Sequence, residues 1–177
     1  MDEKLEAVLN DVNKKNKTLW LIVFSGIIIL ILISIMLNYL QAINAMPIID
    51  PVDADKIALL IILSLAIVIF FIKRSFLIPS KIIELSRKSN SKGHTAVFNV
   101  LKDNAAKQVI MARSVEKANR FLFIVWFLAD LIIVIAFVNY ILAPVLQTFL
   151  VYSVVGLYSL FINFPSKKLL WKIYDYT

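Results

Sequence analysis

The chain lacks the residues from which metal and redox sites are most often built. It has no cysteine and one histidine among 177 residues, which excludes structural disulfides, thiolate zinc sites, Fe–S clusters and bis-histidine haem within one chain. The histidine, His94, stands beside Gly93 in a polar stretch, and neither an HExxH motif nor a recognisable nucleophile–base spacing occurs. We therefore predict no metal, no cofactor and no catalytic residue. A membrane-embedded enzyme stays open as an alternative without candidate residues.

Charged residues are also few, at 18% of the chain, whereas hydrophobic residues make up 60% and the mean hydropathy is +0.83. This apolar share exceeds that of soluble domains, and it is concentrated in four blocks, residues 18–40, 57–78, 121–142 and 145–164. Each block is long enough to cross the hydrocarbon core as a helix, and none alternates as a transmembrane strand would. The sequence predicts an all-α integral membrane protein with four transmembrane helices, the first of them retained rather than cleaved as a signal peptide.

The basic residues are distributed unevenly around these spans. Of the 19 Lys and Arg residues, all but Lys56 precede the first span, lie at the end of the second span or between the second and third, or follow the fourth. The positive-inside rule then places both termini and the middle loop in the cytoplasm. We expect a multi-pass protein of the plasma membrane, the inner membrane of a bacterial or archaeal cell.

The same positive charge, a net +7 at pH 7, favours anionic lipid headgroups as partners. Nucleic acid is not expected, because no nucleic-acid-binding motif accompanies the charge. Long basic side chains at the ends of spans can extend along apolar surface to the headgroups. The residues predicted to contact headgroups are Lys73, Arg74, Lys81, Lys167 and Lys168.

Residues 79–120, between the second and third spans, predict a basic cytoplasmic helical hairpin. A short amphipathic helix covers residues 82–88, and a second helix, capped by Thr95, continues into the third span. Val97, Leu101 and Val109 share one face of that second helix, which we predict to be an interaction surface. About forty residues are too few for an independent core, so the hairpin must pack on itself, on the N-terminal segment or on another protein.

The remaining segments complete the predicted organisation. Residues 1–17 carry Leu5, Val8, Leu9 and Val12 on one helical face, which indicates a cytoplasmic amphipathic helix, with a plain polar leader as the alternative. Residues 18–78 form a first transmembrane hairpin and residues 121–164 a second one. Residues 165–177 are predicted only as a cytoplasmic tail.

One acidic residue, Asp130, stands in the middle of the third span, ten positions from both Arg120 and Tyr140. A carboxylate there lies about 15 Å from either interface and costs about 2.5–3.5 kcal/mol to insert. Antiparallel packing of the third and fourth spans predicts Tyr158 and Ser159 as hydrogen-bond donors to it. Two roles follow, a static one in which protonated Asp130 holds helices together, and a proton-carrying one.

The outer segment between the first two spans contains Asp50, Asp53 and Asp55. The ligand spacing, central glycine and closing glutamate of a calcium loop are missing. We interpret these acids as residues that cap the next helix.

A weak internal repeat leaves two explanations open, duplication of a two-helix unit or independent use of the same interface residues. The two pairs of matching positions are Pro79–Lys81 with Pro165–Lys167, and Asn38–Tyr39 with Asn139–Tyr140.

Together these features predict a non-enzymatic membrane protein that acts as a homo-oligomer, or as a small assembly or scaffold subunit of a larger membrane complex. Its short outer loops and larger basic inner face predict partners on the cytoplasmic side. The alternative is a small proton-coupled transporter or channel that uses Asp130.

Overall fold

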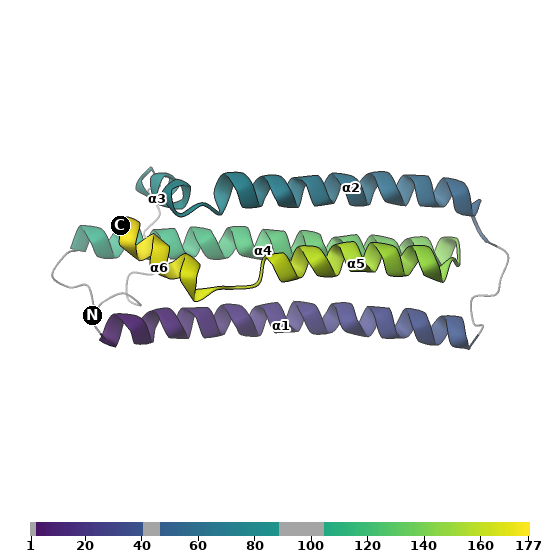
Figure 1. Cartoon of the computed structure of the whole chain (residues 1–177), viewed down its shortest axis with the longest axis horizontal. Coiled ribbons are helices and arrows are strands. Elements are labelled where there is room, and N and C mark those ends of the chain that lie inside the picture. The colour runs from purple at the N-terminus through teal and green to yellow at the C-terminus, as the bar shows by residue number, and fades with distance from the viewer. Residues whose placement is uncertain (1–2, 41–46, 89–104) are drawn as a thin grey trace. The chain divides into compact units, whose positions relative to one another are not determined.

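A computed structural model describes residues 3–40, 47–88 and 105–177, and these residues are helical without any strand (Figure 1). The all-α prediction is therefore confirmed for the described part of the chain. In chain order the helices are α1 (Glu3–Tyr39), α2 (Pro51–Phe76), α3 (Pro79–Arg87), α4 (Ala105–Leu142), α5 (Leu146–Ile162) and α6 (Lys167–Tyr176).

Three of these helices, α1, α2 and α4, are long and apolar enough to cross a membrane. A fourth span results if α5 and α6, which are separated by a short break, are counted together. On its own α5 has 17 residues and is about 25 Å long, somewhat short of a hydrocarbon core of about 30 Å. The described residues are thus all-helical and include three to four helices that can span a membrane.

The chain divides into two compact units. The first, here called the basic unit, comprises Met1–Trp20, Phe71–Ile124 and Phe164–Thr177, and the second, the apolar unit, comprises Leu21–Phe70 and Val125–Asn163. Lys56 is the one basic residue of the apolar unit, and all other Lys and Arg residues of the chain belong to the basic unit. The two units therefore differ in the solvent to which their surfaces are suited.

The basic unit has a hydrophobic core to which four helices contribute. Nine buried side chains form it: Leu9 of α1, Ile82 and Ile83 of α3, Met111, Ala112, Val115 and Ala118 of α4, and Leu170 and Ile173 of α6. The first part of α1 and the middle segment of the chain thus pack together, as one of the sequence-based alternatives requires. Residues 165–177, predicted only as a tail, contribute a further helix, α6, which packs against α3.

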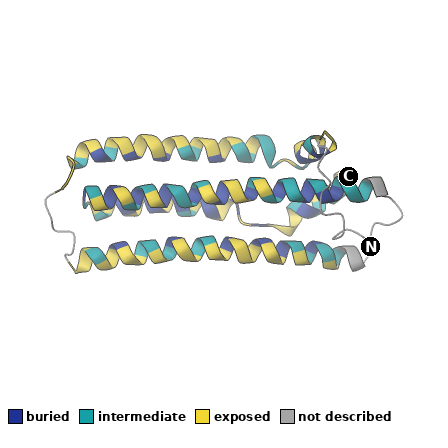
Figure 2. Ribbon diagram, turned by 180° about the vertical axis from the view of Figure 1, so that it is seen from behind, coloured by how far each residue is buried: buried dark blue, intermediate teal, exposed yellow. Residues whose placement is uncertain are grey.

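The apolar unit is built around α4 and α5. One set of buried residues on α4 recurs every three or four positions: Val125, Ala129, Ile132, Ala136 and Asn139. On α5 the small residues Ser153, Gly156 and Ser159 are buried. Most of the surface of α1 and α2 is exposed (Figure 2), and large apolar side chains such as Leu60 and Phe70 cover it, as expected for helices that contact lipid.

The helix starts show how local sequence sets the element boundaries. Asp50 caps α2, since its carboxylate accepts a 2.8 Å hydrogen bond from the Val52 backbone N–H, and Pro51 is the first helical residue. Pro79 occupies the same position in α3, whereas in α6 Pro165 precedes the N-cap, Ser166, whose hydroxyl accepts from the Lys168 N–H. The matching triplets therefore both begin a helix, but in different registers.

The order of elements is nevertheless repeated. A long helix, an apolar helix and a short amphipathic helix occur as α1, α2, α3 and again as α4, α5, α6, and the long helices have 37 and 38 residues. Corresponding elements contact each other: Asn16 of α1 bonds Asn119 of α4, Tyr152 of α5 bonds Asp55 of α2, and α3 packs on α6. The repeated order is what duplication of a three-helix unit would produce, although α2 has 26 residues and α5 has 17.

Candidate functional site

Asp130 lies on α4 at the margin of its buried face. Ala129 and Ile133 beside it are fully buried, whereas Phe127 and Val134, one turn away on the other side, are exposed. Asp130 itself is half-buried. Within the part of the chain that the structure describes, its carboxyl makes no hydrogen bond or ion pair. The carboxyl therefore has one flank toward the packed helix face and the other toward the surface of the apolar unit.

The contact between α4 and α5 beside Asp130 is close because α5 carries a glycine there. A Cβ atom added to Gly156 would lie 2.4 Å from Cγ1 of Ile133 and 3.1 Å from the carbonyl oxygen of Ala129. Any side chain at position 156 would have to displace Ile133, which is fully buried. Glycine thus permits the close approach of two helices on which membrane interfaces rely.

The two predicted partners of Asp130, which are consecutive residues of α5, differ in exposure. Tyr158 is exposed, and Ser159 is buried. The backbone carbonyl of Ser159 accepts a 2.7 Å hydrogen bond from Nδ2 of Asn163, but among the described residues neither Tyr158 nor Ser159 bonds the Asp130 carboxyl. The roles predicted for Asp130, Tyr158 and Ser159 stay predictions.

Another polar contact, which the sequence analysis missed, joins α5 to α2. The Tyr152 hydroxyl donates a 2.6 Å hydrogen bond to the Asp55 carboxylate, and Tyr152 is buried within the apolar unit. Asp53 instead forms an exposed ion pair with Lys56 at 3.0 Å. Of the three acids near the start of α2, Asp50 caps the helix as predicted, whereas Asp55 fixes the start of α2 against α5.

The basic unit contains a polar contact between α1 and α4. Nδ2 of Asn16 donates a 2.7 Å hydrogen bond to Oδ1 of Asn119. Asn13, one turn before Asn16, and Ser114 are also buried, and their side-chain oxygens have no hydrogen-bond partner among the described residues. Buried asparagines of this kind specify which helices pair, at a cost in stability.

The other predicted site residues have varied positions. Val97 and Leu101 of the predicted interaction surface lie outside the described residues, and Val109 is half-buried on α4. Of the predicted headgroup residues, Lys73 is half-buried, and Arg74, Lys81, Lys167 and Lys168 are exposed. All five belong to the basic unit.

The described residues contain no group of three or more His, Cys, Asp or Glu side chains that could hold a metal ion. No protein-family model matches the chain, and no curated protein or solved structure matches it either.

Proposed function

We propose that this protein is a non-enzymatic membrane subunit that assembles through its apolar unit, either as a homo-oligomer or as a small part of a larger membrane complex. The observation that carries the proposal is the position of Asp130, half-buried at the margin of the packed face of α4 and without a polar partner among the described residues. A carboxyl group in this position gains most from a donor on a neighbouring chain.

Such a contact contributes little to the free energy of assembly, but its hydrogen-bond geometry restricts which partner can bind. Interhelical hydrogen bonds in membranes contribute about 0.6 kcal/mol on average, so Asp130 would select a partner more than it would stabilise the complex. Exposed Phe127 and Val134 flank it on the same helix, and they would supply packing around the polar contact. The proposed interface is therefore the strip of α4 that holds Phe127, Asp130 and Val134.

The basic unit is proposed to face the cytoplasm, because it holds all the basic residues except Lys56. Its surface would contact anionic headgroups of the inner leaflet, with Lys73, Arg74, Lys81, Lys167 and Lys168 nearest to them. Partners would then meet the protein on the cytoplasmic side as well as within the membrane.

Cysteine cross-linking tests the α4 interface directly, because the chain has no cysteine of its own. A single cysteine at Val134 should give an oxidant-dependent cross-linked dimer in membranes, or a cross-link to a co-purifying partner. A cysteine at Ile67, lipid-exposed on α2 at 60%, is the control and should remain largely uncoupled. Equal cross-linking at both positions, or none at either in a protein that purifies as a monomer alone, would reject the proposal.

Substitutions at Asp130 then identify the polar contact. Asp130→Leu should weaken the assembly because it removes the hydrogen bond, whereas Asp130→Asn should preserve it. Ser64→Leu, a polar-to-apolar change at an exposed position on α2, is the matched control. An Asp130→Leu protein whose complexes are as stable as those of the unaltered protein contradicts the role given to Asp130.

The second candidate function is proton-coupled transport. It is favoured by the same carboxyl, because a proton on Asp130 that is not held by a hydrogen bond within the described residues is available for exchange. In vesicles containing the reconstituted protein, a pH gradient should drive flux, and Asp130→Asn should abolish the flux without changing assembly, since an amide cannot cycle between charged and neutral forms. Assembly that depends on Asp130 without any pH-driven flux favours the first proposal.

A further inference from the structure

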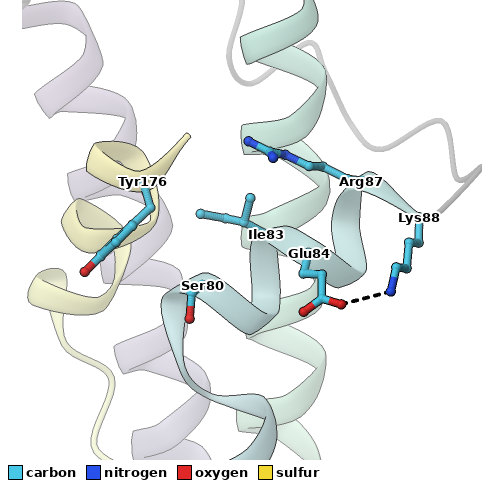
Figure 3. A pocket seen from close by; sticks show the side chains of 6 residues that line it. All are labelled: Ser80, Ile83, Glu84, Arg87, Lys88 and Tyr176. Atoms are coloured by element: carbon cyan, nitrogen blue, oxygen red, sulfur yellow. Dashed lines mark hydrogen bonds and ion pairs between the residues drawn. The ribbon is translucent and has the colours of Figure 1, made fainter.

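The basic unit contains an open pocket between α3 and α6. Its volume is about 350 Å³, and it is lined by Ser80, Ile83, Glu84, Arg87, Lys88 and Tyr176. Figure 3 shows Ser80 on the first turn of α3, Arg87 and Lys88 at the end of that helix, and Tyr176 on the facing α6, with Ile83 between them. The pocket therefore combines polar groups from two helices around an apolar centre.

The shape of this pocket is set by the core beneath it. Ile83, which lines the pocket, and its neighbour Ile82 are both buried in the core that α3 shares with α6, and so is Ile173 of α6. Pro79 at the first position of α3 follows Ile78 in an extended conformation, so the start of the helix is also fixed. Packing thus fixes the helix α3 and the side chain of Ile83, while the other five lining side chains are exposed.

The acidic member of the pocket is already paired. Both carboxylate oxygens of Glu84 accept hydrogen bonds, Oε2 from Lys81 at 3.2 Å and Oε1 from Lys88 at 2.9 Å. The hydrogen bond from Lys88, then that from Lys81, lowers the pKa of the exposed Glu84 carboxyl below its usual range. Glu84 therefore remains ionised at neutral pH with its acceptor oxygens occupied.

The groups left over in the pocket are hydrogen-bond donors. The Arg87 guanidinium has no ion-pair partner among the described residues and extends across the pocket toward the side of α6 (Figure 3). Ser80 and Tyr176 carry hydroxyl groups, which point away from the Arg87 guanidinium (Figure 3), and the ammonium of Lys88 has further N–H groups beyond the one that bonds Glu84. Donors in excess, with a net positive charge from Lys81, Arg87 and Lys88 against Glu84, select a ligand that is anionic and rich in acceptors.

We propose that the pocket between α3 and α6 binds a phosphate-bearing group of headgroup size, with Arg87 as its main anchor. A pocket of about 350 Å³ lies within the range of about 300–1,000 Å³ found for small-molecule sites, so it accommodates a phosphoglycerol group rather than only a bare ion. An anionic phospholipid and a soluble phosphate ester both carry such a phosphate group. The phospholipid is a candidate because α3 begins three residues after the apolar helix α2 ends.

The test uses the whole protein in lipid nanodiscs and counts bound molecules by native mass spectrometry. One arm contains phosphatidylcholine alone, a second adds phosphatidylglycerol, and a third adds glycerol 3-phosphate to the phosphatidylcholine discs. Phosphatidylglycerol retained by the released protein identifies a lipid headgroup as the ligand. Retention only of glycerol 3-phosphate identifies a soluble phosphate ester.

The variants assign the binding to this pocket. Arg87→Gln should weaken retention of the ligand about tenfold, which is the loss expected for a charge-assisted hydrogen bond, and Tyr176→Phe should weaken it less. Lys172→Gln, an exposed basic residue of α6 outside the pocket, removes the same charge as a control and should leave binding unchanged. Circular dichroism of each variant checks that the helices are intact.

Two results would overturn the inference. One is the absence of any retained ligand in both anionic arms. The other is an equal loss with Arg87→Gln and Lys172→Gln, which would mean that the general surface charge attracts the ligand. The inference does not depend on Asp130 or on oligomerisation, so either proposal can fail without the other.

Discussion

The basic unit and the apolar unit differ in the residues that the same helix, α4, leaves exposed. It buries large and small apolar residues in both units, such as Met111 and Ala112 in the basic unit and Ile132 and Ala129 in the apolar unit. Its exposed residues differ, because charged Arg120 is exposed in the basic unit and large apolar Phe127 is exposed in the apolar unit. Where water is the solvent, burial of apolar area stabilises the packing, and where lipid is the solvent, close approach of small residues does.

The ion pairs of the two units are alike in kind. The basic unit contains exposed ion pairs such as Lys15–Asp11 and Arg120–Glu116, each between residues one turn apart. In the apolar unit an ion pair of the same local type joins Lys56 to Asp53 at the start of α2. Such exposed pairs contribute little to stability, so the contrast in packing, rather than in charge, should dominate the effects of substitution.

The largest expected effect comes from truncating a core residue of the basic unit. Ile173 is fully buried there, and Ile173→Ala should lower the free energy of unfolding by about 2–5 kcal/mol, through lost apolar burial and a cavity. Ile67→Ala on α2 is the matched control, because Ile67 is 60% exposed in the apolar unit, and it should change little. Denaturant unfolding in detergent measures both. Similar losses of unfolding free energy for Ile173→Ala and Ile67→Ala would contradict the distinction drawn between the two units.

A smaller effect is expected from enlarging the glycine of the apolar unit. Gly156→Ala places a methyl group against Ile133, and such overpacking costs about 1–3 kcal/mol. Ile133→Ala in the same chain should restore part of the loss, because it removes the side chain that clashes. Unfolding of the two single variants and the double variant gives the coupling, and an additive result would show that α4 and α5 are not in close contact at this position.

The Asn16–Asn119 hydrogen bond of the basic unit should contribute about 0.5–1.5 kcal/mol, the usual net value for such a bond. A double-mutant cycle with Asn16→Ala and Asn119→Ala measures it. Replacing both residues by Leu should be neutral or stabilising, since no buried amide is then left unpaired. A large loss with the double Leu variant would contradict the view that these asparagines select the helix pairing rather than stabilise it.

The smallest effect is expected from the hydrogen bond of the apolar unit. Tyr152→Phe removes the hydroxyl that donates to Asp55, and contacts of this kind between membrane helices contribute about 0.6 kcal/mol. Asp55→Asn provides the complementary measurement, because an amide oxygen can still accept the bond. In the same detergent, the loss of unfolding free energy caused by Tyr152→Phe should be smaller than the coupling free energy between Asn16 and Asn119. The reverse order would mean that polar contacts matter more in the apolar unit.

Local features of the sequence predict much of the fold, and contacts between distant residues account for the rest. The apolar blocks reveal the spanning helices because a stretch of about 20 apolar residues is a local property. The ten-residue helix α6 is too short to be stable alone, and its packing against α3 cannot be inferred from residues 165–177 by themselves. The bond between Tyr152 and Asp55 joins residues 97 positions apart.

The partners of Asp130 could not be predicted from the sequence, because they depend on how each helix is rotated about its axis. Counting residues from the turn between α4 and α5 gives the depth of Asp130 and suggests Ser159 opposite it. The count does not give the rotation of each helix about its axis, and in the structure Gly156 of α5 faces Ala129, the neighbour of Asp130. The sequence did contain an indication of which face of α5 packs. The small residues Ser153, Gly156 and Ser159 recur every three positions, and all three are buried.

The repeated element order has a consequence for synthesis of the protein. Ile83 of the first half is buried in a core completed by Ile173 of the second half, and the chain between them takes about 5–20 s to translate at ordinary rates. During this interval α1 to α3 are made while the residues of α6 that cover Ile83 are not. Newly made first halves on neighbouring ribosomes would therefore present matching uncovered surfaces to each other, until the tethered second half of each chain arrives and competes for them.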